Sequence, residues 1–128
     1  MPVRLLNSSV LAWPDRATVD AAVRAWILVE GPKHMRLLGV AYFGSYSRGD
    51  WGVGSDLDLV AVVEASTESF DRRPLGWDLS PLPVPADLLV YTQAEWNCLM
   101  KEDSLFARTL KREAVWFCGA EPHNAEKP

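Results

Sequence analysis

Two aspartates, Asp56 and Asp58, stand two positions apart at the start of an apolar run that ends at Val63. The run is rich in β-branched residues and has the length of a buried strand. Because alternate side chains of a strand share one face, both carboxylates would point the same way, with Cα atoms about 7 Å apart. Two such anions favour a cation between them, and Mg²⁺ prefers one or two carboxylates together with substrate phosphates. The pair predicts a magnesium site, although a lone D-x-D motif also fits two solvated aspartates.

A second apolar run, residues 37–43, ends at Gly44-Ser45 and leads into a short helical turn expected over residues 46–49. A strand that stops at such a turn offers backbone N–H groups and a hydroxyl to an anion such as phosphate. Arg48 would lie near the same pocket. Gly44-Ser45 taken alone also fits an ordinary turn, so the phosphate interpretation depends on the neighbouring aspartates.

Together these residues resemble the signature of the nucleotidyltransferase superfamily that includes the beta-type DNA polymerases. The signature reads G-S-x-x-R-G, five residues, and then S-D-x-D. The chain fills every fixed position at that spacing, with Gly44, Ser45, Arg48, Gly49, Ser55, Asp56 and Asp58. The chain length further resembles the minimal nucleotidyltransferases, which are little larger than this core. The resemblance covers residues 37–91 well and the rest loosely.

The resemblance implies a third carboxylate on a later strand, and Asp87 opens the run DLLVY. By alternation Asp87 would share a face with Leu89 and Tyr91, although a surface aspartate at the start of a strand is the alternative. The implied catalytic and metal-binding residues, holding two Mg²⁺ ions, are Asp56, Asp58 and Asp87. The implied nucleotide-binding residues are Gly44, Ser45, Arg48 and Ser55.

The implied activity is transfer of a nucleoside monophosphate from a nucleoside triphosphate, with ATP favoured, to a hydroxyl acceptor, with release of pyrophosphate. Aminoglycoside-modifying members and polymerases bind their acceptors with additional domains, so a small-molecule acceptor is disfavoured. Minimal members are often paired with a small helical HEPN protein in a toxin-antitoxin system. The leading expectation is therefore an antitoxin that modifies its partner toxin. The alternative is a catalytically silent module that binds nucleotide or neutralises the partner by contact alone.

Composition limits the other possibilities. A chain of 128 residues with 48% hydrophobic content fits one domain, expected over residues 1–120, with a disordered tail over 121–128. The formal net charge of −4 disfavours a nucleic-acid partner, because no broad basic surface is available. The sequence has neither a signal peptide nor a membrane-length apolar stretch, and its two cysteines, Cys98 and Cys118, are expected to be buried and reduced. A cytoplasmic protein is expected.

Local patterns predict the elements that must position these residues. Apolar positions at helical spacing predict a helix over residues 16–30, with Trp26 as a core anchor. A capping box at Thr92–Glu95 predicts a helix over residues 93–101, and Asp103 or Ser104 would cap another. Residues 114–118 read as a last short strand.

The remaining segments show weaker patterns. Residues 64–86 are rich in proline and serine, which leaves room for a single helical turn at 69–73. Arg72 and Arg73 there are expected to be solvated, with phosphate contact as the alternative. Trp51 is expected to shield its loop, although it could instead lie over a bound base.

The order of elements predicts an α/β (α+β) domain with a small mixed β-sheet and helices mainly on one face. By the resemblance, this is a nucleotidyltransferase fold. The three acids would then cluster at one end of the sheet.

Overall fold

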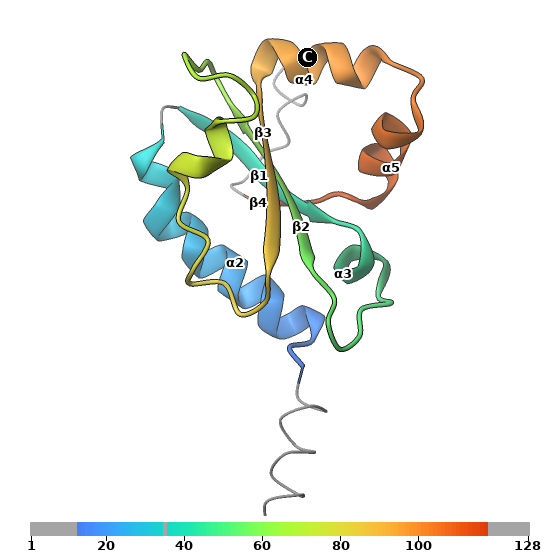
Figure 1. Cartoon of the computed structure of the whole chain (residues 1–128). Helices are drawn as coiled ribbons and strands as arrows, with labels where there is room; N and C mark the ends of the chain where they lie inside the picture. Colours follow the sequence, from blue (N-terminus) through green and yellow to red (C-terminus); the bar gives the residue numbers. More distant parts are fainter. Residues whose placement is uncertain (1–12, 35, 118–128) are drawn as a thin grey trace, which may run out of the picture.

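A four-stranded mixed β-sheet forms the centre of the molecule (Figure 1). The computed structural model describes residues 13–34 and 36–117. The strand order is β3-β2-β1-β4, where β1 runs antiparallel to β2 and β4, and β2 is parallel to β3. The strands are β1 (Leu37–Phe43), β2 (Leu57–Val63), β3 (Ala86–Thr92) and β4 (Val115–Phe117). The predicted α/β class with a mixed sheet is confirmed.

Helix α2 (Arg16–Glu30) forms over the predicted residues. Its N-cap is Asp15, whose carboxylate accepts a hydrogen bond from the Thr18 backbone N–H at 2.9 Å. Trp26 is 3% exposed, and its indole Nε1 donates to the carbonyl of Asp78 at 2.7 Å. Trp26 is therefore the core anchor that the pattern predicted, and α2 passes into the 3₁₀ turn η1 (Gly31–Lys33).

Helix α4 (Gln93–Lys101) begins at the predicted capping box, in which Thr92 and Glu95 bond each other's backbone N–H groups. Ser104 caps helix α5 (Leu105–Glu113), and its hydroxyl accepts from the Ala107 backbone N–H at 3.1 Å. After α5 the chain enters β4, which pairs with β1 at the edge of the sheet. Both helices begin where their capping residues indicated.

The helices cover both faces of the sheet, so the expectation that they lie mainly on one face is wrong. Helix α2 packs on one face, and α4 and α5 pack on the other (Figure 1). The reason lies in β2, where Leu57 and Leu59 join the core on the α2 side while Val60 and Val62 join the core on the α4/α5 side. A central strand that is apolar on both sides needs cover on both sides.

The segment between β2 and β3 is irregular, as predicted, and a turn forms at the expected residues 69–73, where the Ser69 carbonyl accepts from the backbone N–H groups of Arg72 and Arg73. A second turn follows it. The 3₁₀ turn η2 (Arg73–Gly76) carries Pro74 near its first position, where the fixed φ of proline suits a helical start. After η2, the segment contributes Trp77, Leu82 and Val84 to the core on the α2 side. It therefore shields the part of that face that α2 leaves uncovered.

The Arg73 side chain is nearly covered by its neighbours, which contradicts the expectation that it is solvated. It is 8% exposed and makes a bidentate ion pair with Glu95 at 2.6 and 3.0 Å. It also donates to the carbonyl of Val90 at 3.0 Å. The neighbouring Arg72 is 69% exposed, as expected. Arg73 thus ties the irregular segment to β3 and to the capping box of α4.

Three further sequence expectations concern the cysteines, the last strand and membrane-spanning segments. Cys98 is exposed, contrary to expectation, because Trp96 and Leu99 supply the buried side of α4. Strand β4 begins at Val115, one residue later than in the predicted 114–118, and Cys118 and the tail 121–128 lie outside the described residues. In the part of the chain that the structure describes, no helix is both long enough and apolar enough to cross a membrane.

Candidate active site

Asp58 and Asp87 are direct partners in the parallel pairing of β2 with β3. Side chains at paired positions project from the same face of a sheet. Leu89 and Tyr91, which alternate with Asp87, pack against the core on the α4/α5 side. Both carboxylates therefore belong to that face, near the N-terminal ends of the two strands. The topology brings together two acids that are 29 positions apart in the chain.

The three predicted acids interact electrostatically. Asp58 is half-buried, whereas Asp56 and Asp87 are exposed. Burial raises the pKa of the Asp58 carboxyl above its usual value, and the charges of Asp87 and then Asp56 raise it further. Arg48 acts in the opposite direction. A carboxylate that is desolvated and beside two like charges favours a bound cation or a proton.

Gly44 allows Asp58 to lie against the backbone of the turn that follows β1. Its backbone φ is +80°, a value that residues other than glycine rarely adopt. A Cβ atom added to Gly44 would lie 2.3 Å from Oδ2 of Asp58, which is far inside contact distance. The backbone conformation and the close approach of the Asp58 carboxylate therefore both favour glycine at this position.

The short helix α3 (Ser45–Arg48) follows Gly44 and begins one residue earlier than predicted. Tyr46 is fully buried within it and donates a hydrogen bond to the carbonyl of Pro14 at 2.8 Å. Arg16 of α2 donates to the carbonyl of Ser47 at 3.3 Å. Contacts with residues just before α2 and within it thus fix α3, and with it the turn at Gly44.

Glu113, the last residue of α5, is part of this site although the sequence did not indicate it. Its Oε1 accepts from the backbone N–H of Gly44 at 3.2 Å and lies 3.3 Å from Nη1 of Arg48. Its backbone carbonyl accepts from the Ser47 hydroxyl. One local signal was available, because an acid in the last turn of a helix opposes the helix dipole and has to be stabilised by another contact.

Arg48 is shared between two acids in this structure. Its Nε lies 3.1 Å from Oδ2 of Asp50, and its Nη1 contacts Glu113. Ser55, a predicted nucleotide-binding residue, uses its hydroxyl to accept from the Gly52 backbone N–H at 2.7 Å. In this structure, Ser55 therefore stabilises the loop that precedes Asp56.

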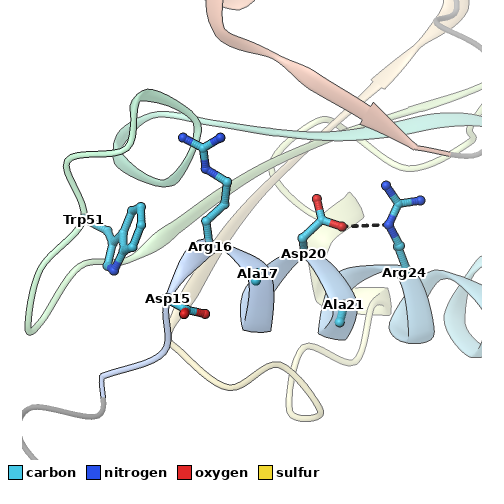
Figure 2. Close-up of a pocket in the computed structure, with 7 residues that line it drawn as sticks. All are labelled: Asp15, Arg16, Ala17, Asp20, Ala21, Arg24 and Trp51. Carbon is cyan, nitrogen blue, oxygen red and sulfur yellow. Dashed lines mark hydrogen bonds and ion pairs between the residues drawn. The ribbon is translucent and has the colours of Figure 1, made fainter.

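Trp51 packs against the core on the α2 side and stacks on Tyr46, with ring centroids 5.7 Å apart and planes 8° from parallel. It also borders a cavity of about 600 Å³ beside α2 (Figure 2). None of the predicted site residues lines this cavity, in which Asp20 and Arg24 form an ion pair at 2.7 Å. Its lining residues are Asp15, Arg16, Ala17, Asp20, Ala21, Arg24 and Trp51.

The profile of the nucleotidyltransferase domain family matches residues 30–116, which include the whole signature and Asp87. The chain belongs to this family. An inferred nucleotidyltransferase from Sulfolobus solfataricus, known from its crystal structure, has a similar fold at 18% sequence identity and a TM-score of 0.57. The similarity covers 80% of this chain and 81% of that one. No curated protein matches the chain.

The donor set of this nucleotidyltransferase domain suits a hard divalent cation. Within residues 13–34 and 36–117, no three acidic, histidine or cysteine side chains are grouped closely enough to hold a metal ion by themselves. The site instead offers the paired carboxylates of Asp58 and Asp87, with Asp56 nearby. Mg²⁺ commonly binds one or two carboxylates and completes its shell with water and substrate phosphates. The residues present therefore fit a magnesium ion that arrives with a nucleotide.

Proposed function

We propose that this domain transfers a nucleoside monophosphate, with AMP from ATP favoured, to a hydroxyl acceptor. The observation that carries the proposal is the register pairing of Asp58 with Asp87 directly beside Gly44. Asp58 belongs to the family signature on β2, whereas Asp87 lies on β3, and their pairing supports a shared role for the two acids. The net reaction forms a bond from the acceptor oxygen to the α-phosphorus and breaks the α–β phosphate bond, so pyrophosphate leaves.

Each residue has a proposed task in this reaction. Mg²⁺ held by Asp56, Asp58 and Asp87, as two ions, would stabilise charge on the attacking and leaving oxygens. Gly44 and Ser45 would hold the β- and γ-phosphates, and the Arg48 guanidinium would pair with a phosphate oxygen. Asp87, which is more exposed than Asp58, would face the acceptor and favour loss of its hydroxyl proton. Ser55 would keep the loop before Asp56 in place for nucleotide binding.

The proposed acceptor is a hydroxyl on a partner protein, specifically a small helical HEPN-type toxin. Asp56 and Asp87 are exposed, so a docked protein surface could reach the acids. Docking also orients the acceptor, and orientation of this kind can supply about 7 to 11 kcal/mol of the barrier. In this proposal the domain acts as the antitoxin.

A second candidate function is a module that neutralises the same partner by contact, without turnover. Two observations favour it. The three aspartates do not form a closed metal site within the described residues, and Arg48 is engaged by Asp50 and Glu113.

The deciding experiment is to purify the full chain with the protein that accompanies it in the native cell. The complex is then incubated with Mg²⁺ and each of the four nucleoside triphosphates, and intact masses are measured. We expect the partner to gain the mass of one nucleoside monophosphate. Asp87→Asn should abolish that gain while the complex still assembles, because the change removes a ligand and leaves the surface shape intact. A complex that forms but is never modified would support the contact-only module.

A further inference from the structure

The Glu113 side chain is anchored at the turn where β1 meets α3. It is only 9% exposed, and its Oε1 accepts from the Gly44 backbone N–H at 3.2 Å. The same oxygen lies 3.3 Å from Nη1 of Arg48. The nearly buried Glu113 carboxylate thus accepts hydrogen bonds from a backbone N–H group and from a guanidinium group at the same time.

These two donors are the ones that the proposed function assigns to the triphosphate. Carboxylate and phosphate oxygens are both anionic acceptors, and both prefer charge-assisted hydrogen bonds from backbone N–H groups and arginine. One N–H group makes one good hydrogen bond, so the two acceptors exclude each other at Gly44. A phosphate oxygen can bind this N–H only after the Glu113 carboxylate has left it.

We propose that Glu113 is an internal competitor for the triphosphate, which a nucleotide must displace from Gly44 and Arg48 in order to bind. The inference rests on the proposed function. It adds a specificity-determining residue to the site, since ligands with few phosphate oxygens would lack the other contacts needed to displace the carboxylate.

The surroundings of Glu113 allow the side chain to move while the backbone stays in place. The Ser47 hydroxyl bonds the Glu113 backbone carbonyl and would hold the end of α5 in position. Arg112, whose side chain is 65% exposed, lies 3.7 Å from Oε2 and offers the displaced carboxylate another partner. Remaining near Asp58 is unfavourable, because the Glu113 charge contributes to the raised pKa of the Asp58 carboxyl. The proposed displacement therefore moves the Glu113 side chain alone and leaves the end of α5 in place.

The test measures binding of two probes, tripolyphosphate and ATP, to the full chain in the presence of Mg²⁺. Glu113→Gln keeps the side-chain shape but removes the charge, and Glu113→Asp keeps the charge but shortens the reach to Gly44. Both variants should bind tripolyphosphate and ATP about tenfold more tightly than the wild type, which corresponds to one charge-assisted hydrogen bond. Glu64→Gln is the matched control, because Glu64 is 50% exposed in its pair with Arg36 beyond the far end of β2. Its affinity should equal that of the wild type.

Melting curves identify which variants are folded, and either Glu113 variant alone can decide the question. Tight binding by a Glu113 variant where the wild type binds weakly or not at all supports the inference. Equal or weaker binding by the folded Glu113 variants, with measurable wild-type binding, overturns the inference and leaves the proposed function standing. Binding by none of the proteins overturns both.

Discussion

Replacing Gly44 with alanine tests the arrangement of the site most directly, because the structure predicts two separate costs. The first is conformational, since alanine would have to adopt φ +80° and ψ −147°. The second is steric, since the new Cβ would lie 2.3 Å from Oδ2 of Asp58. Relief of that contact requires the Asp58 carboxylate to rotate away from Gly44, so Gly44→Ala should also weaken nucleotide binding.

The two costs can be estimated. A residue other than glycine in such a backbone conformation costs about 1–3 kcal/mol. Forcing an extra carbon into an occupied space costs about 1–3 kcal/mol more. The free energy of unfolding of Gly44→Ala should therefore fall by about 2–6 kcal/mol, and its melting temperature by roughly 6–30 °C for a domain of this size.

Two glycines of the loop between α3 and β2 separate these costs. Gly54 has φ +87°, but a Cβ there would meet nothing within 4 Å, so Gly54→Ala carries only the conformational cost. Gly52 has neither a positive φ nor a neighbour within 4 Å, so Gly52→Ala should change stability by less than about 1 kcal/mol. Urea unfolding and thermal melts measure all three. If Gly44→Ala is no less stable than Gly54→Ala, the close approach of Asp58 to Gly44 is refuted.

Three further predictions concern charges. Because burial and the neighbouring acids raise the folded-state pKa of Asp58, wild-type stability should fall as pH rises from 3.8 through that pKa, and Asp58→Asn should melt at a higher temperature than the wild type at pH 7 without ligand. Melts across pH check this, and the difference should vanish below pH 3.8. Arg73→Ala should cost about 2 kcal/mol by urea unfolding, whereas Arg72→Ala should cost less than about 0.5 kcal/mol, and equal losses would contradict the role of the partly buried ion pair. ATP affinity measured by calorimetry should collapse when Mg²⁺ is chelated, and unchanged affinity would remove the metal assignment.

Local sequence patterns determined most of the secondary structure. Helix α2 and strands β1 and β2 appear with the predicted bounds, and α4 begins at its capping box. These features depend on side-chain periodicity and on capping bonds between residues three or four positions apart, so a short window contains the information. The signature spacing likewise indicated the family to which the chain belongs.

Contacts between distant segments were decided by the tertiary structure alone. Arg73 reads as a surface residue in its own segment and is buried only because α4 presents Glu95 to it, 22 positions later. The covering of both sheet faces depends in the same way on where the chain returns after β3.

The residues of the candidate site likewise fall into those that the sequence indicated and one that only the tertiary structure revealed. The aspartates and Gly44 could be read from one motif and one strand, and even Asp87 required only strand alternation and the family pattern. Glu113 reaches Gly44 across 69 positions, and no local rule specifies that the end of α5 lies beside that turn. The sequence by itself determined which residues could do chemistry. Only the packing of α5 and β4 against β1 decided that the Glu113 carboxylate bonds the Gly44 N–H group. That contact exists only after the sheet and the helices have assembled.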